Sequence, residues 1–143
     1  MLKVESKQDK PPAGCYDYKW LTNPKRNTYH ASPSVHKCDK SGQQEYTISP
    51  DWQGTYWYRI NPSIGTKIPV SATKENHCGT YATGWIQGSS TTSLGQTIES
   101  KVCFSYSGKS CRWEAIVKIR NCGHYNLYYL PDTPICNIRY CVE

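Results

Sequence analysis

The chain has 143 residues, enough for one domain with a modest core. Leu, Ile, Val and Phe make up only about 15% of it. However, the net charge of +6 is moderate and the chain carries five Trp and twelve Tyr residues, so the composition argues against intrinsic disorder. The positive charge is spread along the sequence, which indicates a solvated surface and predicts no nucleic-acid partner.

Residues 1–14 are rich in charge and end in Pro-Pro-Ala-Gly. This composition predicts a flexible leader or linker. From Cys15 onward, short apolar or aromatic runs alternate with Gly, Pro, Asn and Ser, so residues 15–143 are predicted to form the folded domain. No stretch has a clear helical period, although KWLTNPKRN is compatible with a single helical turn.

Short runs of β-branched and aromatic residues between turn residues predict a mostly β fold, a small disulfide-stapled antiparallel sheet with long loops and little helix. The clearest strand is Arg112–Arg120, in which the odd positions from 113 to 119 are apolar and should face the core. Asn121-Cys122-Gly123 follows it and predicts a hairpin turn. The predicted strands are Thr55–Ile60, Thr66–Val70, Thr80–Ile86, Ser100–Tyr106, Arg112–Arg120, His124–Leu130 and Ile135–Cys141.

Eight cysteines are spread over the predicted domain. An even count in a loop-rich chain with a thin aliphatic core predicts a disulfide framework and an oxidising compartment, although eight cysteines allow 105 connectivities and the sequence alone does not choose among them. Zinc is the alternative, but only Cys136 and Cys141 approach zinc-ligand spacing and no matching histidine pair exists. We therefore predict no metal site. The cysteines are Cys15, Cys38, Cys78, Cys103, Cys111, Cys122, Cys136 and Cys141.

No catalytic residue or cofactor is predicted. The chain has no Cys-x-x-Cys motif, its four histidines lie on apparent loops or turns, and its acidic residues form no obvious cluster. The sequence therefore indicates a protein that is not an enzyme. No segment is long and apolar enough to cross a membrane, so no direct membrane insertion is predicted either.

The aromatic residues have two interpretations. In the first, which we favour, Trp and Tyr fill the core in place of the scarce Leu and Val. In the second, some of them are exposed platforms that stack on sugars or bases. The candidate ligand-binding aromatics of the second interpretation are Trp52, Trp57 and Trp85.

None of the seven asparagines begins an Asn-x-Ser/Thr site with x other than Pro. Gln53-Gly-Thr and Gln87-Gly-Ser are each one substitution away from such a site. The sequence therefore predicts no N-linked glycan, and a Gln87→Asn change should create an acceptor if Gly88 lies in an exposed loop.

The segment SGKSCRWEAIVKIRNCGHYNLYYLPDTPICNIRYC resembles the end of the eight-cysteine domain shared by uromodulin, the pancreatic secretory granule membrane major glycoprotein and oncoprotein-induced transcript 3 protein. CYDYKWLTNPKRNT, the CDKS at Cys38, WYRI, IPV and HCGTYATGWIQGSS follow in the order of that family. The resemblance covers Cys15 to Cys141 and rests on cysteine spacing with interleaved aromatic residues.

The resemblance implies an extracellular module of a larger secreted or surface glycoprotein, beside epidermal-growth-factor-like and zona-pellucida-type modules. It implies a role in recognition, adhesion or innate defence, with extracellular proteins, glycans or microbial surfaces as partners. The alternative function is a direct carbohydrate-binding lectin that uses Trp52, Trp57 or Trp85. The family pairing of the cysteines implies the bonds Cys15–Cys122, Cys38–Cys136, Cys78–Cys141 and Cys103–Cys111.

Overall fold

The computed structural model describes residues 10–32 and 36–143. Most of the predicted leader, residues 1–9, lies outside the described residues. The described end of the predicted leader, residues 10–14, contacts the domain: Arg120 Nη1 donates a hydrogen bond of 2.6 Å to the carbonyl of Gly14. The backbone amide of Cys15 donates to the carbonyl of Pro12 at 3.2 Å.

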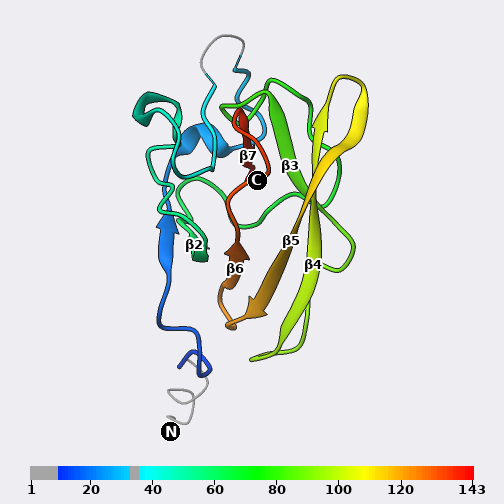
Figure 1. The fold of residues 1–143 in the computed structure, drawn as a ribbon. Helices are drawn as coiled ribbons and strands as arrows, with labels where there is room; N and C mark the ends of the chain where they lie inside the picture. Colours follow the sequence, from blue (N-terminus) through cyan, green and yellow to red (C-terminus); the bar gives the residue numbers. More distant parts are fainter. Residues whose placement is uncertain (1–9, 33–35) are drawn as a thin grey trace, which may run out of the picture.

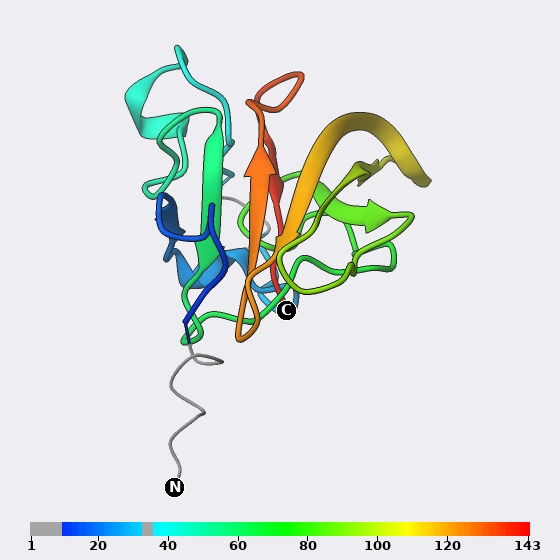
Figure 2. The ribbon, with the colours of Figure 1, turned by 90° about the horizontal axis from the view of Figure 1, so that it is seen from below.

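The domain is built on a single seven-stranded sheet with the strand order β1-β2-β6-β5-β4-β3-β7. Seen from below, β2, β6 and β5 cross the view in that order (Figure 2). The inner neighbours pair antiparallel, whereas β1 with β2 and β3 with β7, at the two edges, pair parallel. The strands are β1 Lys19–Leu21, β2 Tyr56–Ile60, β3 Ala82–Gln87, β4 Thr97–Tyr106, β5 Lys109–Asn121, β6 Asn126–Leu130 and β7 Ile138–Tyr140 (Figure 1).

The mostly β prediction is confirmed, with two short 3-10 turns, Pro24–Arg26 and Glu45–Thr47, as the helical elements of the described residues. The predicted strand Thr66–Val70 is wrong. Pro69 has no N–H to donate to a ladder, and the neighbouring amides bond elsewhere: that of Thr66 to the carbonyl of Glu143 and that of Ile68 to Tyr128 Oη. The predicted antiparallel pairing holds for the inner strands, whereas short strands at the two edges run parallel to their neighbours.

Strand β5 has the predicted alternation and pairs with both β4 and β6. Val117 and Ile119 are fully buried, and Trp113 and Ala115 pack against the same core from half-buried positions. The even positions from 112 to 118 are exposed. Gly123 in the turn after β5 has a φ of +96°, which a side chain would disfavour. The predicted hairpin and the facing of β5 are therefore confirmed.

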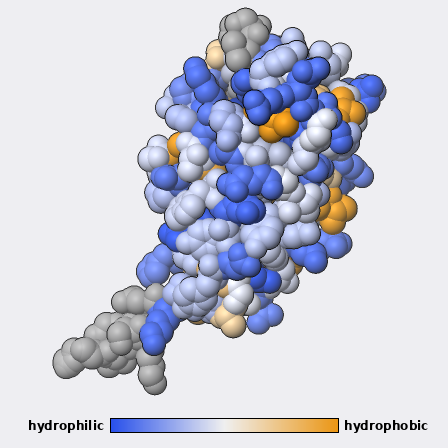
Figure 3. All heavy atoms as spheres, turned by 60° about the vertical axis from the view of Figure 1, so that its left-hand side comes forward, coloured by the Kyte–Doolittle hydropathy of each residue, from blue (hydrophilic) through white to orange (hydrophobic). Residues whose placement is uncertain are grey.

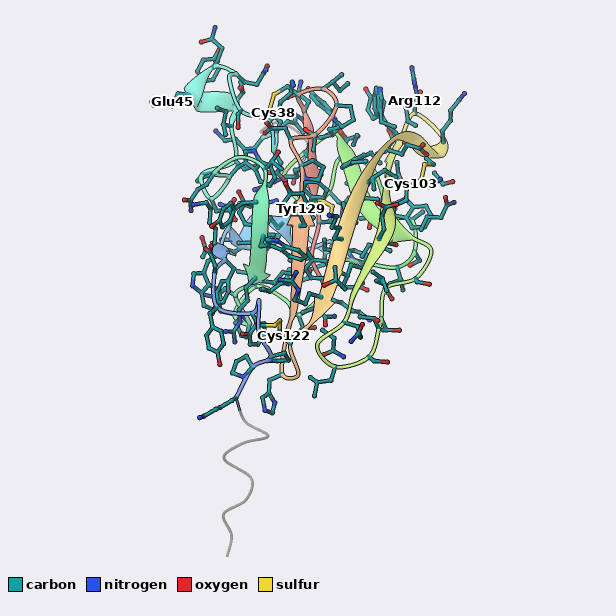
Figure 4. The ribbon with its side chains drawn as sticks, turned by 60° about the horizontal axis from the view of Figure 1, so that its bottom comes forward. Cys38, Glu45, Cys103, Arg112, Cys122 and Tyr129 are labelled. Carbon is teal, nitrogen blue, oxygen red and sulfur yellow. A yellow bond between two sulfur atoms is a disulfide. The ribbon has the colours of Figure 1, made fainter. Side chains whose placement is uncertain are left out.

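Four disulfides connect distant parts of the chain: Cys15–Cys122, Cys38–Cys136, Cys78–Cys141 and Cys103–Cys111. These are the pairs that the resemblance implies. Cys38 and Cys122 lie at opposite ends of the domain (Figure 4). Three of the bonds join residues 63 to 107 positions apart, whereas the fourth closes a separation of 8 across the β4–β5 hairpin. Closing long loops restricts the unfolded chain most, so the three long-range bonds supplement the small core.

Two arginines and two aspartates form a buried ion cluster, which consists of Arg26, Asp39, Asp51 and Arg139. Arg26 Nη1 and Nη2 donate to the two oxygens of Asp39 at 2.7 and 2.8 Å, and Nε and Nη2 donate to those of Asp51 at 2.9 and 2.6 Å. Burial would lower the pKa of Arg26, but attraction to Asp39 and Asp51 raises it; burial would raise the pKa of Asp51, but attraction to Arg26 lowers it. The cluster connects three parts of the chain: the turn after β1, the segment that precedes β2, and strand β7.

Candidate functional site

Aromatic rings and cations alternate on the outer face of β1, β2, β6 and β5. Because side chains alternate along a strand, Trp57 and Arg59 share the side of β2 opposite to buried Tyr58 and Ile60. Register places Tyr129 beside Trp57 and Lys118 beside Tyr129. We call this surface the cation–aromatic face; it consists of Tyr18, Trp20, Trp57, Arg59, Lys118, Arg120, Tyr125 and Tyr129.

Arg59 is enclosed by three rings of this face. Its guanidinium carbon lies 3.7 Å from the ring centroid of Tyr125, 4.7 Å from that of Trp20 and 5.7 Å from that of Tyr18. Nη1 also donates a hydrogen bond of 2.9 Å to Tyr18 Oη. Rings at these distances attract a cation through their negative faces, so they hold the guanidinium in place without a carboxylate from the described residues.

The second half of the face repeats this arrangement. Arg120 lies 4.2 Å from the ring of Trp57, and Lys118 Nζ lies 5.6 Å from that of Tyr129. The two rings are themselves in contact, with centroids 5.4 Å apart. Arg120 is fixed further by hydrogen bonds from Nε to Thr97 Oγ1 and from Nη1 to a backbone carbonyl. The Tyr129 position on β6 is marked in Figure 4.

A small second core supports this face from beneath. Cys15, Cys122 and Leu127 are buried together, and Tyr18, Trp57 and Tyr125 pack against them. Tyr125 Oη donates a hydrogen bond of 2.9 Å to the carbonyl of Cys15. Burial, aided by the neighbouring Tyr18, raises the pKa of Tyr125, so its hydroxyl stays protonated and remains a donor. The first disulfide therefore anchors the rings that enclose Arg59.

The three cations of the face, Arg59, Lys118 and Arg120, form no ion pair with another described residue. The acidic residue closest in register is Glu99, which lies opposite Lys118 on β4. Figure 3 shows the β1 and β2 side as mostly blue and pale, with small, separate orange patches. The arrangement can therefore offer cations to carboxylate, sulfate or phosphate groups.

The structure separates the three aromatic candidates of the sequence. Trp52 is 7% exposed, stacks on Tyr58 and Tyr140, and donates from Nε1 to Asp132 at 2.9 Å. Trp85 is 8% exposed, and its Nε1 donates to Ser105 and Ser110. These two side chains are part of the folded interior and offer no surface for stacking.

Trp57 alone of the three lies on the cation–aromatic face, half-buried under Arg120. Arg59 and Arg120 were not among the residues predicted from the sequence. The signal was present in TYWYRI and AIVKIR, where a cation follows an aromatic or apolar residue with the period of a strand. The cation–aromatic contacts themselves, however, join different strands.

The described residues contain no group of three or more His, Cys, Asp or Glu side chains that could hold a metal ion. Within the same part of the chain, no helix has the length and apolar character needed to span a membrane.

A β-rich domain fixed by four disulfides, with a charged aromatic surface, defines the class of small disulfide-stabilised modules typical of extracellular proteins. Within this class, residues 58–142 match the family of uromodulin-like eight-cysteine domains. The match covers more than half of the chain, and the chain belongs to this family.

Relatives at about 30% identity are glycoproteins. The chain is 30% identical over 130 residues to canine pancreatic secretory granule membrane major glycoprotein GP2, an alignment covering 90% of this chain and 23% of the relative. It is 31% identical over 129 residues to the human protein of that name, covering 89% and 21%. It is 28% identical over 88 residues to mouse uromodulin, covering 61% and 14%. The chain thus spans less than a quarter of the length of these relatives.

Proposed function

We propose that this chain is a secreted, non-catalytic recognition module of a larger extracellular glycoprotein, and that it binds anionic groups through the cation–aromatic face. Its partners are extracellular proteins or glycans that carry carboxylate, sulfate or phosphate, including those of microbial surfaces. Such binding would serve recognition, adhesion or innate defence. The relatives GP2 and uromodulin and the four disulfides support the extracellular setting.

The proposal rests on the surroundings of Arg59 and Arg120. Both guanidinium groups contact aromatic rings and have no carboxylate partner among the described residues. An arginine fixed in position loses less side-chain freedom when an anion binds its planar fork. Rings that already hold a guanidinium also have less open surface for a sugar. This favours an anion-binding function over the lectin alternative at Trp57.

A glycan array with sulfated, sialylated and neutral members, repeated at two salt concentrations, tests this function. We expect selective binding of the anionic members that weakens as salt rises. Arg59→Gln and Arg120→Gln should each weaken it at least about tenfold, which corresponds to about 1.4 kcal/mol. Trp57→Ala should weaken it as well, because the ring that supports Arg120 is lost.

Lys74→Gln is the matched control, because it removes the same charge from an exposed side chain remote from the face. It should leave binding within about twofold, since each exposed charge contributes little on its own. If Lys74→Gln weakened binding as much as Arg120→Gln, net charge alone would explain the binding. Equal binding of neutral and anionic glycans would also refute the proposed role of the face.

A further inference from the structure

A separate hollow lies on the core side of the sheet, near the end of the β4–β5 hairpin that carries Arg112 and Cys103 in Figure 4. Its walls are Tyr81, Tyr106, Trp113 and residues 135–138, and its volume is about 220 Å³. Sites for drug-sized ligands have about 300–1,000 Å³. This aromatic pocket is therefore of a size to take a single ring.

The three aromatic side chains of the pocket support one another. The rings of Tyr106 and Trp113 are stacked with centroids 6.0 Å apart, and Tyr81 meets Tyr106 edge-on at 6.3 Å. His36 stacks against Tyr81 with a centroid distance of 3.4 Å. A ligand would meet rings that are already positioned, so little side-chain freedom remains to be lost on binding.

The side-chain polar groups that line this pocket have no hydrogen-bond partner in the described part of the chain, whereas its backbone carbonyls at Asn137 and Ile138 are bonded. Within residues 10–32 and 36–143, the hydroxyls of Tyr81 and Tyr106, the indole N–H of Trp113 and the side-chain amide of Asn137 form no hydrogen bond. In contrast, the indole N–H groups of the buried Trp52 and Trp85 are both bonded. Rings with free polar tips suit a ligand that has both an apolar face and hydroxyl groups.

Charge distinguishes this pocket from the cation–aromatic face. None of its lining residues is charged, and the guanidinium of Arg112 stacks on Trp113 at 4.7 Å outside the lining. An aliphatic occupant would cover the free polar atoms without satisfying them, at a cost of about 1–3 kcal/mol for each one buried. A neutral sugar would pair its hydroxyls with them and place its C–H face on a ring.

We propose that the aromatic pocket binds one neutral pyranose ring, such as the terminal hexose of a glycan. The rings of Tyr81 and Tyr106 would supply the apolar surface, because that of Trp113 is already covered by Arg112. The side-chain amide of Asn137 and the indole N–H of Trp113 would supply hydrogen bonds to the hydroxyls. This site is distinct from the cation–aromatic face in position and in ligand class, so it stands whether or not anions bind there.

NMR titration of the folded, oxidised chain with glucose, galactose, mannose and N-acetylglucosamine tests the proposal. At least one of these sugars should shift the resonances of Tyr81, Tyr106, Trp113 and Asn137 in a saturable way at millimolar concentration. Two variants should weaken that sugar at least tenfold: Tyr81→Ala, and Asn137→Gly, which removes the amide while preserving the left-handed backbone at φ +66°.

Tyr46→Ala is the matched control, because it removes another exposed tyrosine, 70% exposed, that is absent from the lining. This variant and Trp57→Ala should bind the sugar as the unmodified chain does. Thermal unfolding identifies any variant that has lost its fold. In that case the titration of the unmodified chain still shows whether a sugar binds in the pocket. Failure of all four sugars to bind, or binding that both pocket variants leave unchanged, would overturn the proposal.

Discussion

Arg26 and Arg59 show two ways of holding an arginine in this small domain. Arg26 is fully buried and its guanidinium donates to two carboxylates at once. Arg59 is half-exposed and lies among three aromatic rings, with no carboxylate partner among the described residues. In the first case the protein itself satisfies the charge, so the ion cluster can only support the fold. In the second the charge remains available to a ligand.

The number of cations therefore says little about function until their partners are known. Both arginines lie near a disulfide and a buried strand, yet one connects chain segments and the other faces solvent. Burial explains the difference, because a charge withdrawn from water must be paired, whereas a half-exposed guanidinium is stable beside rings and water.

The largest effect should come from complete reduction of the disulfides. Asp39 of the ion cluster follows Cys38, which is bonded to Cys136, and Arg139 lies between Cys136 and Cys141. The cation–aromatic face packs on the Cys15–Cys122 bond. Each long-range bond contributes about 2–5 kcal/mol. Their sum is comparable to the whole stability of about 5–15 kcal/mol expected of a domain. Reduction should therefore unfold both regions together, as followed by near-ultraviolet circular dichroism.

Chelators are the control for this experiment and should leave the spectrum unchanged. Peptide mapping without reduction should recover the four bonded pairs. Persistence of the folded spectrum in a fully reduced sample would show that the two regions do not need their disulfides.

A direct comparison of the two arginines should give the next largest effect. Arg26→Met removes the two-carboxylate hydrogen bonds of the cluster and leaves Asp51 with only the 3.8 Å contact to Arg139. The free energy of unfolding should therefore fall by about 3–5 kcal/mol. Arg59→Met removes the cation–aromatic attraction and one hydrogen bond to Tyr18 Oη, and it should lower the free energy of unfolding by about 1–2 kcal/mol. Urea unfolding of both variants measures the difference, and equal losses would contradict the separation of a structural from a free arginine.

Acid should destabilise the ion cluster, whereas the arginines and the lysine of the cation–aromatic face stay protonated. Arg26 holds the pKa of Asp51 below its ordinary 3.8, although burial acts in the opposite direction. Since the folded pKa is the lower one, the stabilisation is complete above about pH 5 and is lost as pH falls through 3.8 towards the folded value. Urea unfolding between pH 7 and pH 2 should show this decline.

Asp51→Asn is the control for the pH dependence. It should lower stability at pH 7 and give a shallower decline with acid, because one titrating partner of Arg26 is gone. Asp132 adds to the acid sensitivity of both proteins. Burial would raise the pKa of Asp132, but hydrogen bonds from Trp52 and Ser41 lower it. If the stability of Asp51→Asn declined with acid as steeply as that of the unmodified chain, the ion cluster would not be the source of the pH dependence.

The smallest effect on stability should come from Gln87→Asn, far from both arginine environments. Gln87 ends β3 and is exposed, as is the following Gly88. Secretion from eukaryotic cells should give the variant a glycosidase-sensitive mass, while the unmodified chain has no such acceptor. The free energy of unfolding should change by less than about 0.5 kcal/mol. An unglycosylated variant would count against the placement of Gly88 in an exposed loop.

The sequence alone determined the features that depend on neighbouring residues. Alternation in Arg112–Arg120 predicted which side of β5 faces the core, and Gly123 marked the following turn, because the period of two and the left-handed backbone are local properties. The even cysteine count predicted a disulfide framework, and the resemblance to known relatives, more than spacing, supplied the pairs.

Only the tertiary structure decided which aromatic and charged residues are covered. Trp52 is buried by stacking on Tyr58 and Tyr140, and Asp132, 80 positions away, accepts a hydrogen bond from its indole N–H. The ring of Trp57 lies beneath Arg120 from another strand. Thr66–Val70 has strand-like composition, but its backbone finds partners at the C-terminus and on a tyrosine side chain. These outcomes depend on contacts between segments distant in sequence, which a local pattern does not contain.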